Sequence, residues 1–136
     1  MLDTSPLTAA VERFADRLRA APQSRLQQGA AQVALDLARE LSLRAQRLEA
    51  ASADGTAAGD GTGAAPARTM PDAGIFVVGD QLAVAGLDLA EALHAAAAGP
   101  VAGTAAGPGP DAAKAPSEML DEAVRLVDQA EAGALR

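Results

Sequence analysis

The segment GIFVVGDQLAVAGLDLAEALHAAAA, residues 74–98, decides the fold of this chain. It is the most apolar part of the sequence, yet it carries acidic residues and two interior glycines. Apolar or small residues recur along it in alternating steps of four and three, which is typical of the packed face of an α-helix. This pattern predicts a helix over residues 73–98. The residues of the seam are Ile75, Gly79, Leu82, Gly86, Leu89 and Leu93.

Two other interpretations of this segment fail. The stretch IFVVGD has the composition of a β-strand, but no phosphate-binding glycine loop follows it and the chain offers no second strand for pairing. A membrane span needs about 18–20 residues without charge, and Asp80, Asp88 and Glu91 interrupt the segment. We therefore expect neither a nucleotide site nor a transmembrane helix.

The two glycines of the seam predict a close contact with another helix. Each glycine costs about 1 kcal/mol relative to alanine inside a helix, and both lie on the packed side, seven residues apart. A residue without a side chain lets a neighbouring backbone approach closely. We expect another helix to cross at Gly79 and Gly86; a kink or a frayed helix start is the alternative.

The N-terminal part of the chain predicts a pair of antiparallel helices. Apolar residues at helical spacing indicate one helix over residues 6–21, which Pro22 ends, and a second over residues 25–51. Ser5 and Ser24 are the expected N-caps. Because the connection is so short, the two helices should form an antiparallel hairpin.

The second predicted helix carries apolar residues on two sides. Leu35 and Leu43 lie on the side opposite its main apolar stripe. A helix of this kind usually packs against more than one neighbour. These two leucines are therefore candidates for contact with a partner.

The remaining sequence predicts one further helix and two linkers. Residues 52–72 and 99–116 are rich in Gly, Ala and Pro and are expected to be flexible. The last helix should cover residues 117–133, with Ser117 as its N-cap. We therefore expect residues 1–136 to form a single all-α domain, a small four-helix bundle built from the N-terminal hairpin plus two further helices.

Composition and charge argue against several classes of function. The net charge is −7, and residues 52–136 hold twelve acids against four basic residues, whereas nucleic-acid binding requires clustered Lys and Arg. The absence of cysteine excludes disulfides and a Cys nucleophile. The N-terminal residues MLDTSPLTAAVERF lack the pattern of a Sec signal peptide. We expect a cytoplasmic protein that does not bind nucleic acid.

The only histidine, His94, follows Glu91 by three residues, with Asp88 one turn before Glu91. Glu-x-x-His units bind metal in di-iron carboxylate bundles, but those bundles use two such units, and this chain has no second histidine. A histidine that interacts with the dipole at a helix C-terminus is the simpler interpretation. No G-x-S-x-G motif occurs either. We expect no catalytic residue, no metal and no cofactor.

These observations predict a small, non-enzymatic helical protein that acts as an adaptor, a regulator or a structural partner through helix packing. The partner would be another protein or a second copy of the chain in a homodimer. Two alternatives stay open: a metal- or ligand-binding bundle that uses Asp88, Glu91 and His94, and an exported helical-hairpin effector. The residues expected to carry the interaction are Leu35, Leu43, Gly79, Leu82, Gly86 and Leu89.

Overall fold

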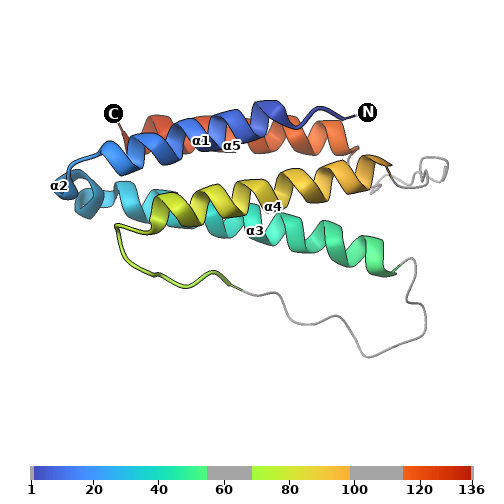
Figure 1. Cartoon of the computed structure of the whole chain (residues 1–136), viewed down its shortest axis with the longest axis horizontal. Helices are drawn as coiled ribbons and strands as arrows, with labels where there is room; N and C mark the ends of the chain where they lie inside the picture. The colour runs from blue at the N-terminus through green and yellow to red at the C-terminus, as the bar shows by residue number, and fades with distance from the viewer. Residues whose placement is uncertain (1, 55–68, 99–114, 136) are drawn as a thin grey trace.

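A computed structural model describes residues 2–54, 69–98 and 115–135 of the chain, and four long helices in these ranges pack lengthwise into a bundle (Figure 1). No strand occurs in the described ranges. The expected all-α four-helix bundle is therefore confirmed. The predicted linkers fall largely on residues 55–68 and 99–114, which lie outside the described residues. The elements are α1 (Ser5–Ala20), α2 (Gln23–Arg25), η1 (Leu26–Ala30), α3 (Ala31–Asp54), α4 (Val78–Ala98) and α5 (Pro116–Ala134).

The arrangement of the four long helices differs from their order in the chain. Helices α1 and α3 run in opposite directions, as a hairpin requires, but α1 packs mainly against α4 and α5, and α3 packs against the same two helices. Helices α1 and α3 therefore lie diagonally across the bundle. Helices α3 and α4 begin at the same end of the bundle and run parallel (Figure 1), unlike consecutive helices of an up-down-up-down bundle.

The N-cap residues of the helices are not the serines expected there, and Ser5 is instead the first residue of α1. Proline lies in the first turn of both α1 and α5, where its fixed φ and missing N–H are tolerated. The N-cap positions are Thr4, Pro22 and Ala115, none of which makes a side-chain cap hydrogen bond. Asp3 instead accepts the Ser5 N–H at 2.9 Å, and hydrogen bonding with Ser5 holds the pKa of Asp3 below its usual range.

The helix expected over residues 25–51 is interrupted near its start. Gly29 has φ 138° and ψ −19°, a conformation that residues with a side chain avoid because of steric strain. The chain therefore bends at Gly29, within η1, with α2 before the bend and α3 after it. Helix α3 then continues to Asp54, into the segment expected to be a linker.

Helix α4 begins at Val78, five residues later than the seam suggests. Gly74 has φ 104° and donates its N–H to Asp72 Oδ1 at 3.0 Å, which forms a local turn. The chain before this turn is fastened to α3, because Arg39 Nε donates to the Met70 carbonyl at 2.8 Å. The start of the segment is thus an anchored turn, and helical geometry begins only after it.

The core lies along the axis of the bundle, where all four long helices contribute buried side chains. Many of these are alanines, and such small side chains allow the helices to approach closely. In the described part of the chain, no helix combines the length and the apolar character that a membrane crossing requires. The largest fully buried side chains are Phe14, Leu7, Leu41, Leu82, Leu93, Val11 and Val127.

Candidate interaction surface

The inner face of α4 packs against α1 at its two glycines. An added Cβ at Gly86 would lie 2.7 Å from Val11 Cγ1, closer than real Cβ atoms approach their neighbours. At Gly79 the added Cβ would lie 3.3 Å from the carbonyl oxygen of Ala15. The predicted close crossing of another helix is therefore confirmed, and that helix is α1.

An ion pair lies at the edge of this crossing. Arg19 Nη2 is 2.6 Å from Asp80 Oδ1, and Arg19 Nη1 is 3.0 Å from Asp16 Oδ1. The hydrogen bond with Asp80 raises the pKa of the Arg19 guanidinium. All three side chains are exposed, so each pair contributes about 0–1 kcal/mol of stability. The glycines, and not these charges, determine how closely α1 approaches α4.

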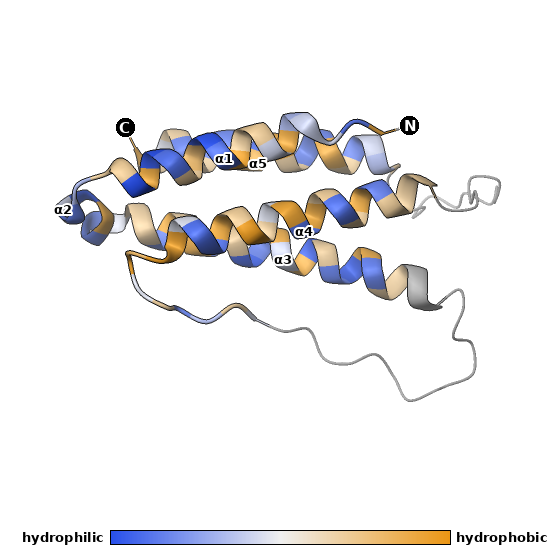
Figure 2. Cartoon of the chain, in the orientation of Figure 1, coloured by the Kyte–Doolittle hydropathy of each residue, from blue (hydrophilic) through white to orange (hydrophobic). Residues whose placement is uncertain are grey.

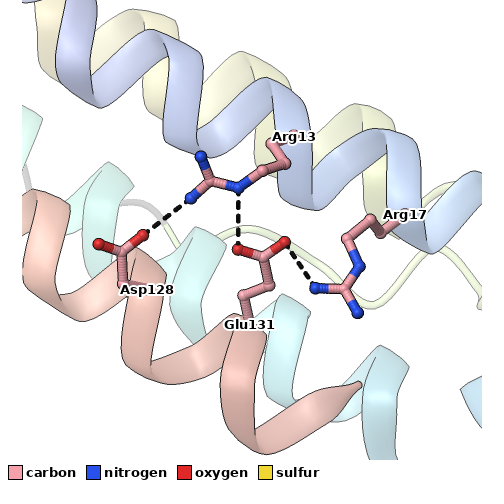
Figure 3. Close-up of polar contacts among 4 residues, drawn as sticks. All are labelled: Arg13, Arg17, Asp128 and Glu131. Carbon is pink, nitrogen blue, oxygen red and sulfur yellow. Dashed lines mark hydrogen bonds and ion pairs between the residues drawn. The ribbon is translucent and has the colours of Figure 1, made fainter. Parts of the chain in front are cut away.

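Helix α1 is joined to α5 by a different kind of contact, shown in Figure 3. Glu131 is the one charged residue that is buried in the described part of the chain. Its Oε1 accepts from Arg13 Nε at 3.2 Å, and its Oε2 accepts from Arg17 Nη1 at 3.0 Å. Arg13 also reaches Asp128 Oδ1 through Nη2 at 2.9 Å. Both oxygens of the buried carboxylate are paired, which is what its burial requires.

Most residues predicted to contact a partner lie inside the bundle. Gly79, Leu82, Gly86 and Leu89 are buried on the inner face of α4. Leu35 is also buried and lines a cleft of about 270 Å³ beside the start of α4. Only Leu43 is partly exposed among the six. Helix α3 contacts both α4 and α5, in line with the apolar residues on its two sides.

The residues of the alternative metal site lie on the outer face of α4. Asp88, Glu91 and His94 are all exposed. Across the described ranges, no group of three or more His, Asp or Glu residues is placed so that it could hold a metal ion. The three side chains are neighbours on one helix face, as their spacing requires.

Large apolar side chains are exposed along the same outer face. The exposed fractions are 53% for Val84, 52% for Leu87 and 39% for Val77. Val84 and Leu87 are three residues apart on α4, so they share one side of the helix axis. Val77 lies in the turn just before α4. Phe76, which is 75% exposed, precedes them in the turn that leads into α4. We call these four residues the outer stripe.

The sequence expectation does not include the outer stripe. The signal for it is nevertheless present, because these are, apart from the buried Val78, the large apolar residues of the segment 74–98 that the glycine seam leaves unassigned. Helix α4 has the most hydrophobic composition of the four long helices, and its colouring in Figure 2 shows this. A helix that is apolar on its inner face and partly apolar on its outer face can bury both.

Acidic side chains border the outer stripe. Asp80 lies one turn before Val84, Asp88 one turn after Val84, and Glu91 one turn after Leu87. All three acids are exposed, and α4 contains neither Lys nor Arg. The surface therefore combines a central apolar contact with negative charge on both sides of it.

Known proteins give no guide to the function of this chain. Comparison with protein families, with curated proteins and with solved structures found no match. The functional assignment therefore depends on the chain's own residues and their geometry.

Proposed function

We propose that this protein acts without catalysis, as a helical adaptor or regulatory partner that binds another macromolecule through helix packing on the outer stripe of α4. One observation carries the proposal: Val84 and Leu87 are adjacent on an outer helix face, and about half of each side chain is exposed. Exposed apolar residues that cluster, unlike single ones, are typical of interaction sites.

The inner and outer faces of α4 have different roles: the inner face packs within the bundle and the outer face binds the partner. The seam residues Gly79 and Gly86 serve the fold, because their contacts are with α1. The outer stripe serves the partner, since Val84 and Leu87 remain available after the bundle is assembled. The mode of action is helix packing, and the contact with the partner lies on the side of α4 opposite the seam.

Non-enzymatic action is part of this proposal. Its support comes from the sequence, which has no cysteine, a single histidine and no nucleophile motif. We place the interaction in the cytoplasm, in keeping with the sequence expectation, and fractionation of the producing cells tests this location.

Site-specific photo-crosslinking tests the proposed surface. A photoreactive amino acid replaces Val84 in cells that naturally make the protein, and the matched control replaces Gln129, an exposed residue of α5. We expect a discrete crosslinked adduct from position 84 and none from position 129. The substitution Leu87→Ser should remove the adduct while the thermal midpoint of unfolding changes little, because Leu87 is already half exposed.

The absence of any adduct at position 84 would contradict the proposal. An adduct that persists unchanged in the Leu87→Ser variant would contradict it as well, because contact with the outer stripe would then not depend on its apolar side chains.

A further inference from the structure

We infer that the partner of the outer stripe is a cationic amphipathic helix of another protein, whose apolar side packs on Val84 and Leu87 and whose Lys or Arg residues face the bordering acids. This inference rests on the proposed function and adds the chemistry of the partner. It follows from the negative charges around the stripe, which attract a cationic partner and repel a second copy of this chain.

The acids are placed to select such a helix. Asp88 follows Val84 by one turn, and Glu91 follows Leu87 by one turn. A helix packed along α4 would therefore contact apolar side chains at its centre and carboxylates beside them. No ion pair between either acid and a described residue is found. Complementary charges of this kind set the specificity and speed of association more than its strength.

The charges contributed by α1 do not reverse this sign. On the α1 side the nearest basic residue, Arg19, is already shared between Asp16 and Asp80. That cluster of one base and two acids remains negative. A cation on the partner would therefore be attracted at both ends of the apolar contact.

A second copy of the chain fits this surface poorly. In an antiparallel pair of α4 helices centred between Val84 and Leu87, Asp80 of each copy would face Glu91 of the other. In a parallel pair, each acid would face its own counterpart. Both arrangements bring like charges together, and such contacts cost up to several kcal/mol.

Binding of two synthetic helical peptides tests the inference. Both have about 18 residues, roughly five turns, and share one leucine pattern; one carries Lys beside the leucines and the other Glu. Fluorescence anisotropy of each labelled peptide, titrated with the full chain, gives its affinity. We expect binding of the Lys peptide only, with affinity that falls as salt rises from about 50 to about 200 mM.

Variants locate the charge effect. The double substitution Asp88→Asn and Glu91→Gln should weaken binding of the Lys peptide roughly three- to tenfold. The matched control, Glu49→Gln with Asp121→Asn, removes the same charge from exposed positions of α3 and α5. It should leave affinity within about twofold, because distant exposed charges are largely screened.

Three results would overturn the inference. These are equal binding of the Glu peptide, no binding of either peptide, and equal losses in the two charge variants. A crosslinked adduct at position 84 without binding of the Lys peptide would leave the proposed function standing and refute the cationic partner. An adduct identified as a second copy of this chain would do the same.

Discussion

Toward α4, helix α1 presents Val11 to the bare backbone at Gly86, whereas toward α5 it presents Arg13 and Arg17 to the buried carboxylate of Glu131. The first contact depends on shape: no atom can be added, and no charge takes part. The second depends on charge, and its arginines are about half exposed. One side of α1 is thus held by close apolar packing, and the other side is held by ion pairs that are partly exposed to solvent.

The two contacts should respond to different perturbations. Over-packing is insensitive to ionic strength, because it acts through atomic overlap. Ion pairs that include exposed groups weaken as salt screens them. Size changes therefore test the α1–α4 contact and salt tests the α1–α5 contact.

The largest effect is expected from Gly86→Leu, which places a large side chain against Val11. We expect a loss of about 3 kcal/mol in the free energy of unfolding, the upper part of the range for over-packed cores. Urea unfolding followed by far-ultraviolet circular dichroism measures it, and this probe suits a chain without Trp or Tyr.

Gly133→Ala is the matched control for this substitution. Gly133 lies in α5, and an added Cβ there meets no atom within 4 Å. We expect a gain of up to about 0.5 kcal/mol from helix propensity. An unchanged urea midpoint for Gly86→Leu would show that α1 does not approach α4 at this point.

A smaller loss is expected from Glu131→Gln, which removes the charge that both arginines share. The neutral amide has one accepting oxygen in place of two, and its NH2 group cannot accept from an arginine. We expect a loss of about 1.5 kcal/mol, reduced because the arginines are half solvated. The difference from the parent chain should narrow in about 1 M salt. A difference that stays constant with salt would mean that packing of the Glu131 stem, and not its charge, joins α5 to α1.

The contact at Gly86 can be tested further by paired substitution. Gly86→Ala alone should destabilise the fold, because its Cβ would overlap Val11. In a Val11→Ala background the overlap disappears, so the two losses should be non-additive by about 1 kcal/mol. Strictly additive losses in the double-mutant cycle would contradict direct contact between the two positions.

The smallest effect is expected at the edge of the same interface. Asp80→Asn removes an exposed partner of Arg19, and we expect a loss below about 0.5 kcal/mol. A loss above about 1 kcal/mol would mean that this ion pair helps to set the position of α1 on α4, and that the two sides of α1 differ less than the geometry indicates.

The sequence predicts which side of each helix is buried more reliably than it predicts the neighbour of that side. The spacing of Gly79, Leu82 and Gly86 identifies the inner face of α4, because a helix repeats every 3.6 residues. The same spacing carries no information about which helix covers that face. The short connection after α1 suggests that α1 packs mainly on α3. In the structure, α1 instead covers the glycines of α4, which lies much later in the chain.

Backbone departures and exposed apolar residues were harder to predict, each for its own reason. Gly29 lies within an apolar repeat that continues across it, so the repeat hides the bend that its positive φ produces. The outer stripe is hard to predict because Val84 and Leu87 belong to a segment that is apolar as a whole, so their exposure does not stand out in the sequence. An apolar residue indicates burial only on average, and single exposed ones are common in folded proteins.

The diagonal placement of α1 and α3 bears on how the chain acquires its structure during synthesis. The ion pair between Arg19 and Asp80 joins residues 61 positions apart, and that between Arg13 and Glu131 joins residues 118 positions apart. Contacts that close such long loops form late. A nascent chain that ends at Asp54 would hold two helices that scarcely cover each other, so we expect the bundle to form as one cooperative unit only after α5 has been made.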